Sequence, residues 1–139
     1  MVSRTLYVEM SGTPDRKGKP LMATGKKDFK AIADGVNEGL SGLSKVAGET
    51  LSAFSSLSKA ANGDGAIDHK TKELIALAIG VAKQCDACIG FHTKTLKKLG
   101  ATDEEVADAL GVCVYMGGGP SLMYAADAWT AWTQLKDAG

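Results

Sequence analysis

The sequence predicts an all-α fold, and three observations support this prediction. Beyond residue 25, apolar side chains recur every three or four residues in six successive segments, which is the spacing of one helix face. Turns rich in glycine, asparagine and proline separate these segments. No segment after residue 25 alternates apolar and polar side chains as a strand does. With 139 residues, 45% of them hydrophobic, the chain can fill one core, so we expect a single helical domain over residues 26–139.

The N-terminal segment and the first two predicted helices precede the part of the chain that carries the candidate site residues. Residues 1–25 combine one short alternating stretch, Leu6–Met10, with a loop rich in glycine and proline, and we expect an extended arm. Apolar residues from Phe29 to Leu43 follow a helical stripe, although three glycines weaken the helix towards its end. A second helix is predicted from about Glu49 to Ala61, where an Asn-Gly turn ends it.

The next two helices should form a buried central hairpin. Asp68 is a suitable N-cap for a third helix, and the segment Leu74–Ala82 is apolar on every side, which predicts complete burial. A fourth helix should begin near Cys85. It should end before Gly100, because lysines occupy its last turn and glycine favours the position just beyond a helix.

Two further helices complete the predicted domain. Thr102 and Glu105 have the spacing of a capping box, which predicts a fifth helix whose apolar stripe places Cys113 on the inner face. The three glycines 117–119 should break that helix. Pro120 then suits the first turn of a sixth helix.

Charge and composition exclude several classes of function. Sixteen basic and sixteen acidic residues cancel, and no block of lysine or arginine suggests binding to nucleic acid or to an anionic membrane. The longest apolar run, Leu74–Ala82, is too short to cross a bilayer, and the N-terminus does not resemble a signal peptide. We therefore expect a cytoplasmic protein. Its three cysteines, two of them close together, indicate redox or metal chemistry instead of a disulfide framework.

Four side chains of the predicted hairpin suggest one chemistry. Cys85, Cys88 and His92 stand at i, i+3 and i+7, on one helix face. If the two helices are antiparallel, Glu73 returns close to His92, and the pair could relay a proton to a thiol. The helix N-terminus should favour a thiolate at Cys85, whereas the negative charge of Asp86 opposes it. Two thiols with such a relay fit peroxide reduction through a sulfenic acid and a disulfide.

The pattern Glu-x11-Cys-x2-Cys-x3-His, preceded by Asp68-His-Lys-Thr-Lys, resembles the AhpD-like alkylhydroperoxidases of the carboxymuconolactone decarboxylase superfamily, over about residues 66–118. The resemblance implies a helical homo-oligomer, a trimer or hexamer, with Glu73 and His92 in the relay. It also implies that Cys88 attacks the peroxide and Cys85 resolves the sulfenic acid, whereas the dipole argument alone favours Cys85 as the nucleophile. No cofactor or resident metal is expected. The expected partners are a hydroperoxide and an external dithiol, lipoyl-type or thioredoxin-like, or a peroxiredoxin. Ala87 replaces a further histidine that some members carry between the cysteines.

Other interpretations of the same residues stay open at this point. The two thiols could form a zinc site completed by His92 and either Cys113 or Glu73, in a non-enzymatic assembly module. The fold could instead decarboxylate a lactone acid, with the thiols vestigial. Glu73 could be an exposed carboxylate paired with Lys70, His92 a solvated or core histidine, and Cys113 an inert core thiol. His69 is expected to be a surface residue.

Overall fold

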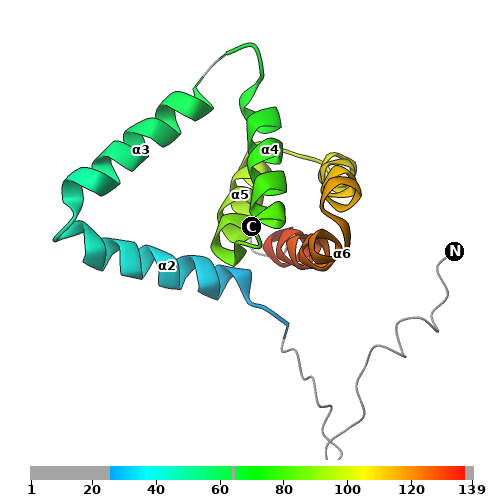
Figure 1. Cartoon of the computed structure of the whole chain (residues 1–139), viewed down its shortest axis with the longest axis horizontal. Coiled ribbons are helices and arrows are strands. Elements are labelled where there is room, and N and C mark those ends of the chain that lie inside the picture. Colours follow the sequence, from blue (N-terminus) through cyan, green and yellow to red (C-terminus); the bar gives the residue numbers. More distant parts are fainter. Residues whose placement is uncertain (1–25, 64, 137–139) are drawn as a thin grey trace, which may run out of the picture.

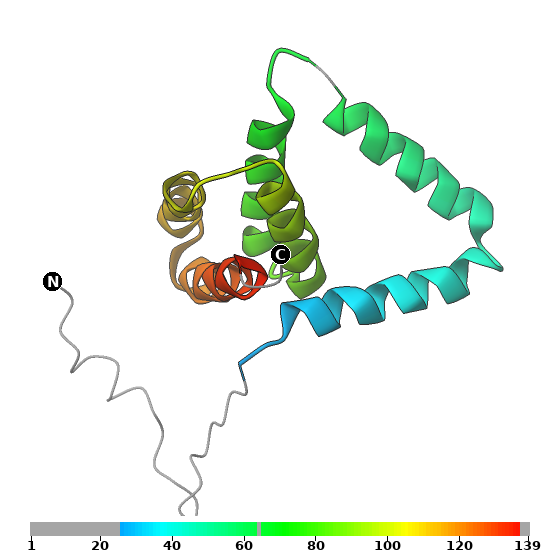
Figure 2. The ribbon, with the colours of Figure 1, turned by 180° about the vertical axis from the view of Figure 1, so that it is seen from behind.

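The structure, a computed structural model, describes residues 26–63 and 65–136. Five helices account for the fold: α2 (Phe29–Ser44), α3 (Gly48–Asn62), α4 (His69–Ala82), α5 (Asp86–Lys98) and α6 (Asp103–Lys136). Figures 1 and 2 show a body formed by α4, α5 and α6, from which α2 and α3 extend to one side. The all-α prediction is confirmed for the described residues, which contain no strand. The predicted N-terminal arm lies outside them.

The central hairpin of α4 and α5 begins and ends where the sequence predicts. The Asp68 carboxylate accepts a hydrogen bond from the N–H of Thr71 at 2.9 Å and caps α4. The turn after α4 includes Gln84 with a φ of 57°, and the N–H of Cys85 donates to the carbonyl of Gly80 at 3.0 Å. The chain thereby reverses within three residues, so that α5 returns along α4.

Gly80 lets the two helices approach each other closely. A Cβ atom built at Gly80 would lie 3.2 Å from the Cβ of Cys88, which is closer than most real Cβ contacts. The missing side chain therefore allows the thiol-bearing turn of α5 to pack directly on the backbone of α4.

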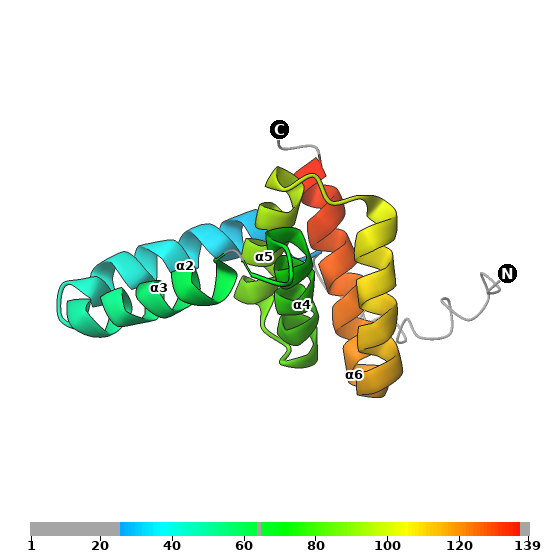
Figure 3. The same ribbon diagram turned by 90° about the horizontal axis from the view of Figure 1, so that it is seen from above.

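The two helices predicted around residue 118 are both present within α6. Thr102 and Glu105 form the expected capping box, with reciprocal hydrogen bonds of 2.9 and 3.2 Å at the start of α6. Gly118 has a φ of 68° and a ψ of −152°, so the helix is interrupted there, and Pro120 follows in the first turn of the second segment. Figure 3 shows the two segments of α6 folding back beside each other.

The hydrophobic core lies between α4, α5, α6 and the beginning of α2. Trp132 is 1% exposed, and its indole N–H donates to the Asp103 carboxylate at 2.7 Å, which ties the two ends of α6 together. The other large apolar side chains that are fully buried are Phe29, Leu77, Ile89, Leu96, Val81 and Val106.

The prediction that α4 is buried on every side is wrong. Its inner residues Leu77 and Val81 are buried, but Ile75 and Ile79 are 46% and 55% exposed. These two isoleucines border an apolar groove that Val112 and Met116 of α6 complete. The apolar character of α4 therefore serves two surfaces, a core face and an exposed face.

The second predicted helix, α3, contributes no buried residue to the described structure. Phe54 and Leu57, on its predicted apolar stripe, are 68% and 63% exposed. Figures 1 and 2 show α2 leaving the body and α3 returning to the start of α4, so that the three helices enclose an open triangle. The pair α2–α3 is therefore an apolar projection, a name we keep for residues 29–62.

Candidate functional site

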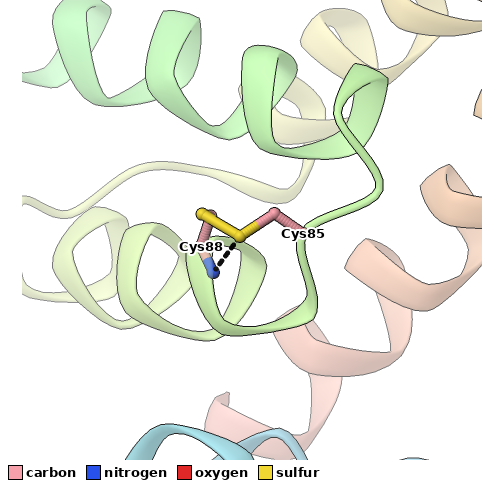
Figure 4. Close-up of a disulfide and its surroundings, with 2 residues drawn as sticks. All are labelled: Cys85 and Cys88. Carbon is pink, nitrogen blue, oxygen red and sulfur yellow. Dashed lines mark hydrogen bonds between the residues drawn. A yellow bond between two sulfur atoms is a disulfide. The ribbon is translucent and has the colours of Figure 1, made fainter. Parts of the chain in front are cut away.

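Two sulfur atoms stand at the beginning of α5. Cys85 is the N-cap residue of α5, and its Sγ accepts the N–H of Cys88 at 3.3 Å. The two cysteines are joined as a disulfide with a Cα–Cα distance of 5.3 Å. Figure 4 shows this bridge between the first turn of α5 and the end of α4. Because a helix N-terminus offers unpaired N–H groups and a positive dipole, Cys85 Sγ occupies a position that favours negative charge after reduction.

The relay pair meets as the hairpin geometry predicts. His92 Nδ1 lies 2.7 Å from Oε2 of Glu73, and the Glu73 side chain is only 5% exposed. A carboxylate can only accept, so it holds the proton on Nδ1 and leaves the lone pair of the ring on Nε2. His92 follows Cys88 by one helical turn on α5, so the ring and the thiols share a face. The meeting of Glu73 and His92 is confirmed as geometry, and their part in a reaction stays a prediction.

The alternative interpretation of Glu73 as an exposed carboxylate paired with Lys70 does not match the contacts. Lys70, the partner considered for Glu73, instead pairs with Glu105 of α6 at 2.6 Å, and this contact lowers the pKa of the Glu105 carboxyl. The other partner of Glu73 is His69, whose Nε2 lies 3.5 Å from Oε1. His69 is exposed at the surface, as expected, and it also contacts the site. Its i, i+4 spacing from Glu73 was the signal in the sequence that could have indicated this.

Lys27 changes the electrostatics that the sequence suggested around Cys85. Asp86, the first residue of α5, was expected to oppose a thiolate, but its carboxylate lies 2.8 Å from Lys27 Nζ. The same ammonium group lies 2.7 Å from Asp127 of α6. Although burial alone would lower the pKa of Lys27, its hydrogen bonds to Asp127 and Asp86 raise it, so the lysine stays charged. Lys27 thus compensates the negative neighbour of Cys85, and no pattern in the sequence pointed to it.

The third thiol, that of Cys113, has contacts of its own. Cys113 is 6% exposed, and its Sγ lies 3.2 Å from the carbonyl oxygen of Ala109 and 3.7 Å from that of Ala78, either of which can accept its single S–H. Burial raises the pKa of this thiol. Within residues 26–63 and 65–136, no group of three or more His, Cys, Asp or Glu side chains is arranged to hold a metal ion. The zinc alternative therefore has no support in this part of the chain.

The protein is a helical protein with a Cys-x-x-Cys pair at the beginning of one helix. A histidine follows one turn later, and a carboxylate on the preceding helix contacts it. A profile of the Carboxymuconolactone decarboxylase family matches residues 48–131, which is more than half of the chain. The chain belongs to this family. The match begins at α3 and reaches the last turns of α6, so it extends beyond the motif region at both ends.

Solved structures of the family support the same assignment. A carboxymuconolactone decarboxylase family protein from Legionella pneumophila is 55% identical, with a TM-score of 0.75 over 76% of this chain and 95% of that one. A family protein from Thermotoga maritima, described with a possible part in antioxidative response, is 30% identical with a TM-score of 0.60, over 64% of this chain and 92% of that one.

Sequence relatives differ in how much of the chain they share. An uncharacterised protein of Cupriavidus necator is 40% identical over 101 residues, which cover 73% of this chain and 89% of the relative. The alkyl hydroperoxide reductase AhpD of Mycobacteroides abscessus is 32% identical over 56 residues, 40% of this chain and 32% of that relative. Within the described residues, no helix is long and apolar enough to cross a membrane.

Proposed function

We propose that the protein is a thiol-dependent peroxidase that reduces an alkyl hydroperoxide through Cys85 and Cys88. The observation that carries the proposal is the disulfide at the beginning of α5, on the helix face of a histidine that a buried carboxylate holds at 2.7 Å. The similarity to an alkyl hydroperoxide reductase, and to a structure described with a possible part in antioxidative response, supports it.

In the proposed reaction, His92 accepts the thiol proton of Cys88 on Nε2, and Glu73 stabilises the resulting imidazolium. The Cys88 thiolate attacks the O–O bond, so that one oxygen is transferred to sulfur. The alkoxide leaves and takes the proton from His92 to become an alcohol. Cys85 then attacks the sulfenic acid of Cys88, which releases water and forms the disulfide. A dithiol supplies two electrons and two protons to restore both thiols.

The position of Cys85, which on the dipole argument alone also suits a nucleophile, suits the proposed role of resolving thiol for the following reason. When a dithiol attacks the Cys88 sulfur of the disulfide, Cys85 must leave as a thiolate. The N–H of Cys88, 3.3 Å from Cys85 Sγ, and the helix dipole stabilise that leaving group. We propose a lipoyl-type or thioredoxin-like dithiol, or a peroxiredoxin, as the redox partner, and a reducing compartment such as the cytoplasm as the location.

The test is consumption of an alkyl hydroperoxide by wild type, Cys85→Ser and Cys88→Ser in the presence of a dithiol. We expect Cys88→Ser to lose turnover at least about a hundredfold, because no nucleophile remains. Before the dithiol is added, Cys85→Ser should consume about one equivalent of peroxide and stop at the sulfenic acid of Cys88, because it has no resolving thiol. Cys113→Ser is the matched control and should keep wild-type turnover.

Equal turnover in all four proteins would remove the cysteine pair from the mechanism. The lactone decarboxylase alternative would then be the reaction to assay. A single equivalent of peroxide consumed by Cys88→Ser, with none by Cys85→Ser, would instead exchange the roles of the two thiols.

A further inference from the structure

The buried carboxylate of Glu73 is shared by two imidazoles, and the second one has no part in the mechanism above. His69 Nε2 lies 3.5 Å from Oε1 of Glu73, while His92 Nδ1 lies 2.7 Å from Oε2. The His69 side chain is 44% exposed and that of Glu73 only 5%. His69 is thus the solvent-facing partner of a carboxylate that is itself almost sealed from water.

The start of α4 fixes where His69 stands. Asp68 accepts hydrogen bonds from both the N–H and the hydroxyl of Thr71, each at 2.9 Å, which holds the first turn in place. These bonds, led by the one from the Thr71 backbone, lower the pKa of the Asp68 carboxyl, so the cap stays ionised. His69 is the first residue of α4 and faces Glu73 one turn further along.

The other charged groups around His69 are directed to partners of their own. On α4, the Lys70 ammonium pairs with Glu105 of α6 at 2.6 Å, and Lys72 donates to the carbonyl of Gly63. On α5, the facing titratable group is His92, which binds the opposite oxygen of the same carboxylate. Glu73 is therefore the anionic group that connects His69 with His92 on α5.

We propose that His69 is a positioning residue whose charge sets how strongly Glu73 holds a proton on His92. When His69 is protonated, it competes with His92 for the single negative charge of Glu73, and the two cations repel each other. His92 then accepts a thiol proton less readily, and fewer thiolates form. When His69 is neutral, Glu73 supports His92 alone.

The size of the effect follows from the distance and the exposure. The charge of His69 lies 3.5 Å from the Glu73 carboxylate, and His69 is partly exposed to solvent. At such a site an ion pair contributes roughly 1 kcal/mol, which corresponds to about a fivefold change in the thiolate population. Because an imidazole carries a positive charge only when it is protonated, the effect should be larger at acid pH than at alkaline pH.

The experiment measures alkylation of the reduced thiols by iodoacetamide between about pH 5 and pH 9, with Cys85 and Cys88 quantified separately by peptide mass spectrometry. We expect His69→Gln to react roughly fivefold faster than wild type near pH 5.5 and at the same rate near pH 8.5. Lys70→Gln is the matched control, because it removes a neighbouring cation that pairs with Glu105. It should follow the wild-type profile.

Three results would overturn the proposal. The first is a His69→Gln profile that coincides with wild type at every pH. The second is a loss of reactivity by one constant factor at all pH values, which a merely structural role would produce. The third is an equal change in Lys70→Gln, which would indicate a general charge effect. The inference rests on the proposed function because it assigns Glu73 and His92 to a relay that forms the thiolate. Alkylation measures the thiolate directly and needs no peroxide. Failure of the peroxidase assay and failure of this inference are therefore distinguishable.

Discussion

Cys113 shows how position separates one thiol from the two at the start of α5. Its sulfur is buried beside two backbone carbonyl oxygens, whereas Cys85 accepts an N–H at a helix end. Burial disfavours a thiolate, and the helix N-terminus favours one. The prediction that Cys113 lies on the inner face of its helix is confirmed, since the residue is 6% exposed.

The raised pKa of Cys113 predicts a loss of stability at alkaline pH. The unfolded thiol ionises near its ordinary value of 9.0, and the folded thiol ionises at a higher pH. Its contribution is therefore fully present below pH 9.0 and is lost as the pH rises through the folded pKa. Urea unfolding of the oxidised protein should show Cys113→Ala less stable by about 1 kcal/mol at neutral pH, from the small cavity. That difference should shrink near pH 10. A constant difference across this range would contradict the assignment.

At the scale of residues, the sequence was informative where spacing alone decides a contact. Cys88 and His92 share a face because they belong to one helix, Cys85 caps its beginning, and the antiparallel hairpin brought Glu73 back to His92. Lys27 could not be found in this way. It is 59 residues before Asp86 and 100 before Asp127, and only the tertiary packing of α5 and α6 places both carboxylates around it.

At the scale of elements, caps and breaks were the most predictable features. Asp68, the Thr102–Glu105 box and the glycines before Pro120 act through backbone geometry within a few residues, and all three helix boundaries are where they were expected. The prediction that α4 is buried on every side was wrong because the apolar character of a side chain does not determine whether another element covers it. Ile79 is as apolar as Leu77, yet one is 55% exposed and the other 1%.

The surroundings of two glycines, one at the contact between α4 and α5 and one in α2, predict opposite effects of substitution by alanine. Gly80→Ala should destabilise the protein by about 1 to 3 kcal/mol, because its Cβ would lie 3.2 Å from that of Cys88 in a packed contact. Gly39→Ala, in α2, meets no atom within 4 Å and should stabilise by roughly 0.5 to 1 kcal/mol through helix propensity. Urea midpoints of both variants test the pair. A stabilising Gly80→Ala would mean that the hairpin is looser than described.

At the scale of the whole molecule, the apolar projection α2–α3 joins the core only at its beginning, through Phe29 and Ala33, and no residue of α3 is buried in the part of the chain that the structure describes. An isolated helix of 15 residues is marginal in water, and α3 has no buried residue of its own among those described. Exposed side chains such as Phe54 and Leu57 would stabilise it if another surface covered them. We propose that a second copy of this chain does so, which accords with the oligomer that the family resemblance implies.

The projection predicts how the assembly should respond to charge. We expect the wild-type protein to have a mass several times that of one chain, and the double variant Phe54→Lys with Leu57→Lys to dissociate. Each lysine removes an apolar contact worth roughly 2 kcal/mol and places a cation in the interface, so affinity should fall at least about a hundredfold. Light scattering after size-exclusion chromatography measures the mass, and circular dichroism should show a partial loss of helix as α3 loses its cover.

Ser55→Lys provides a control for added charge, because Ser55 is an exposed polar residue on the same helix and the variant gains one of the two positive charges. It should keep the wild-type mass. If the double variant also kept that mass, the projection would not be the interface. The exposed isoleucines of α4 beside Met116 would then be the next apolar surface to substitute, since no part of the chain that the structure describes covers them.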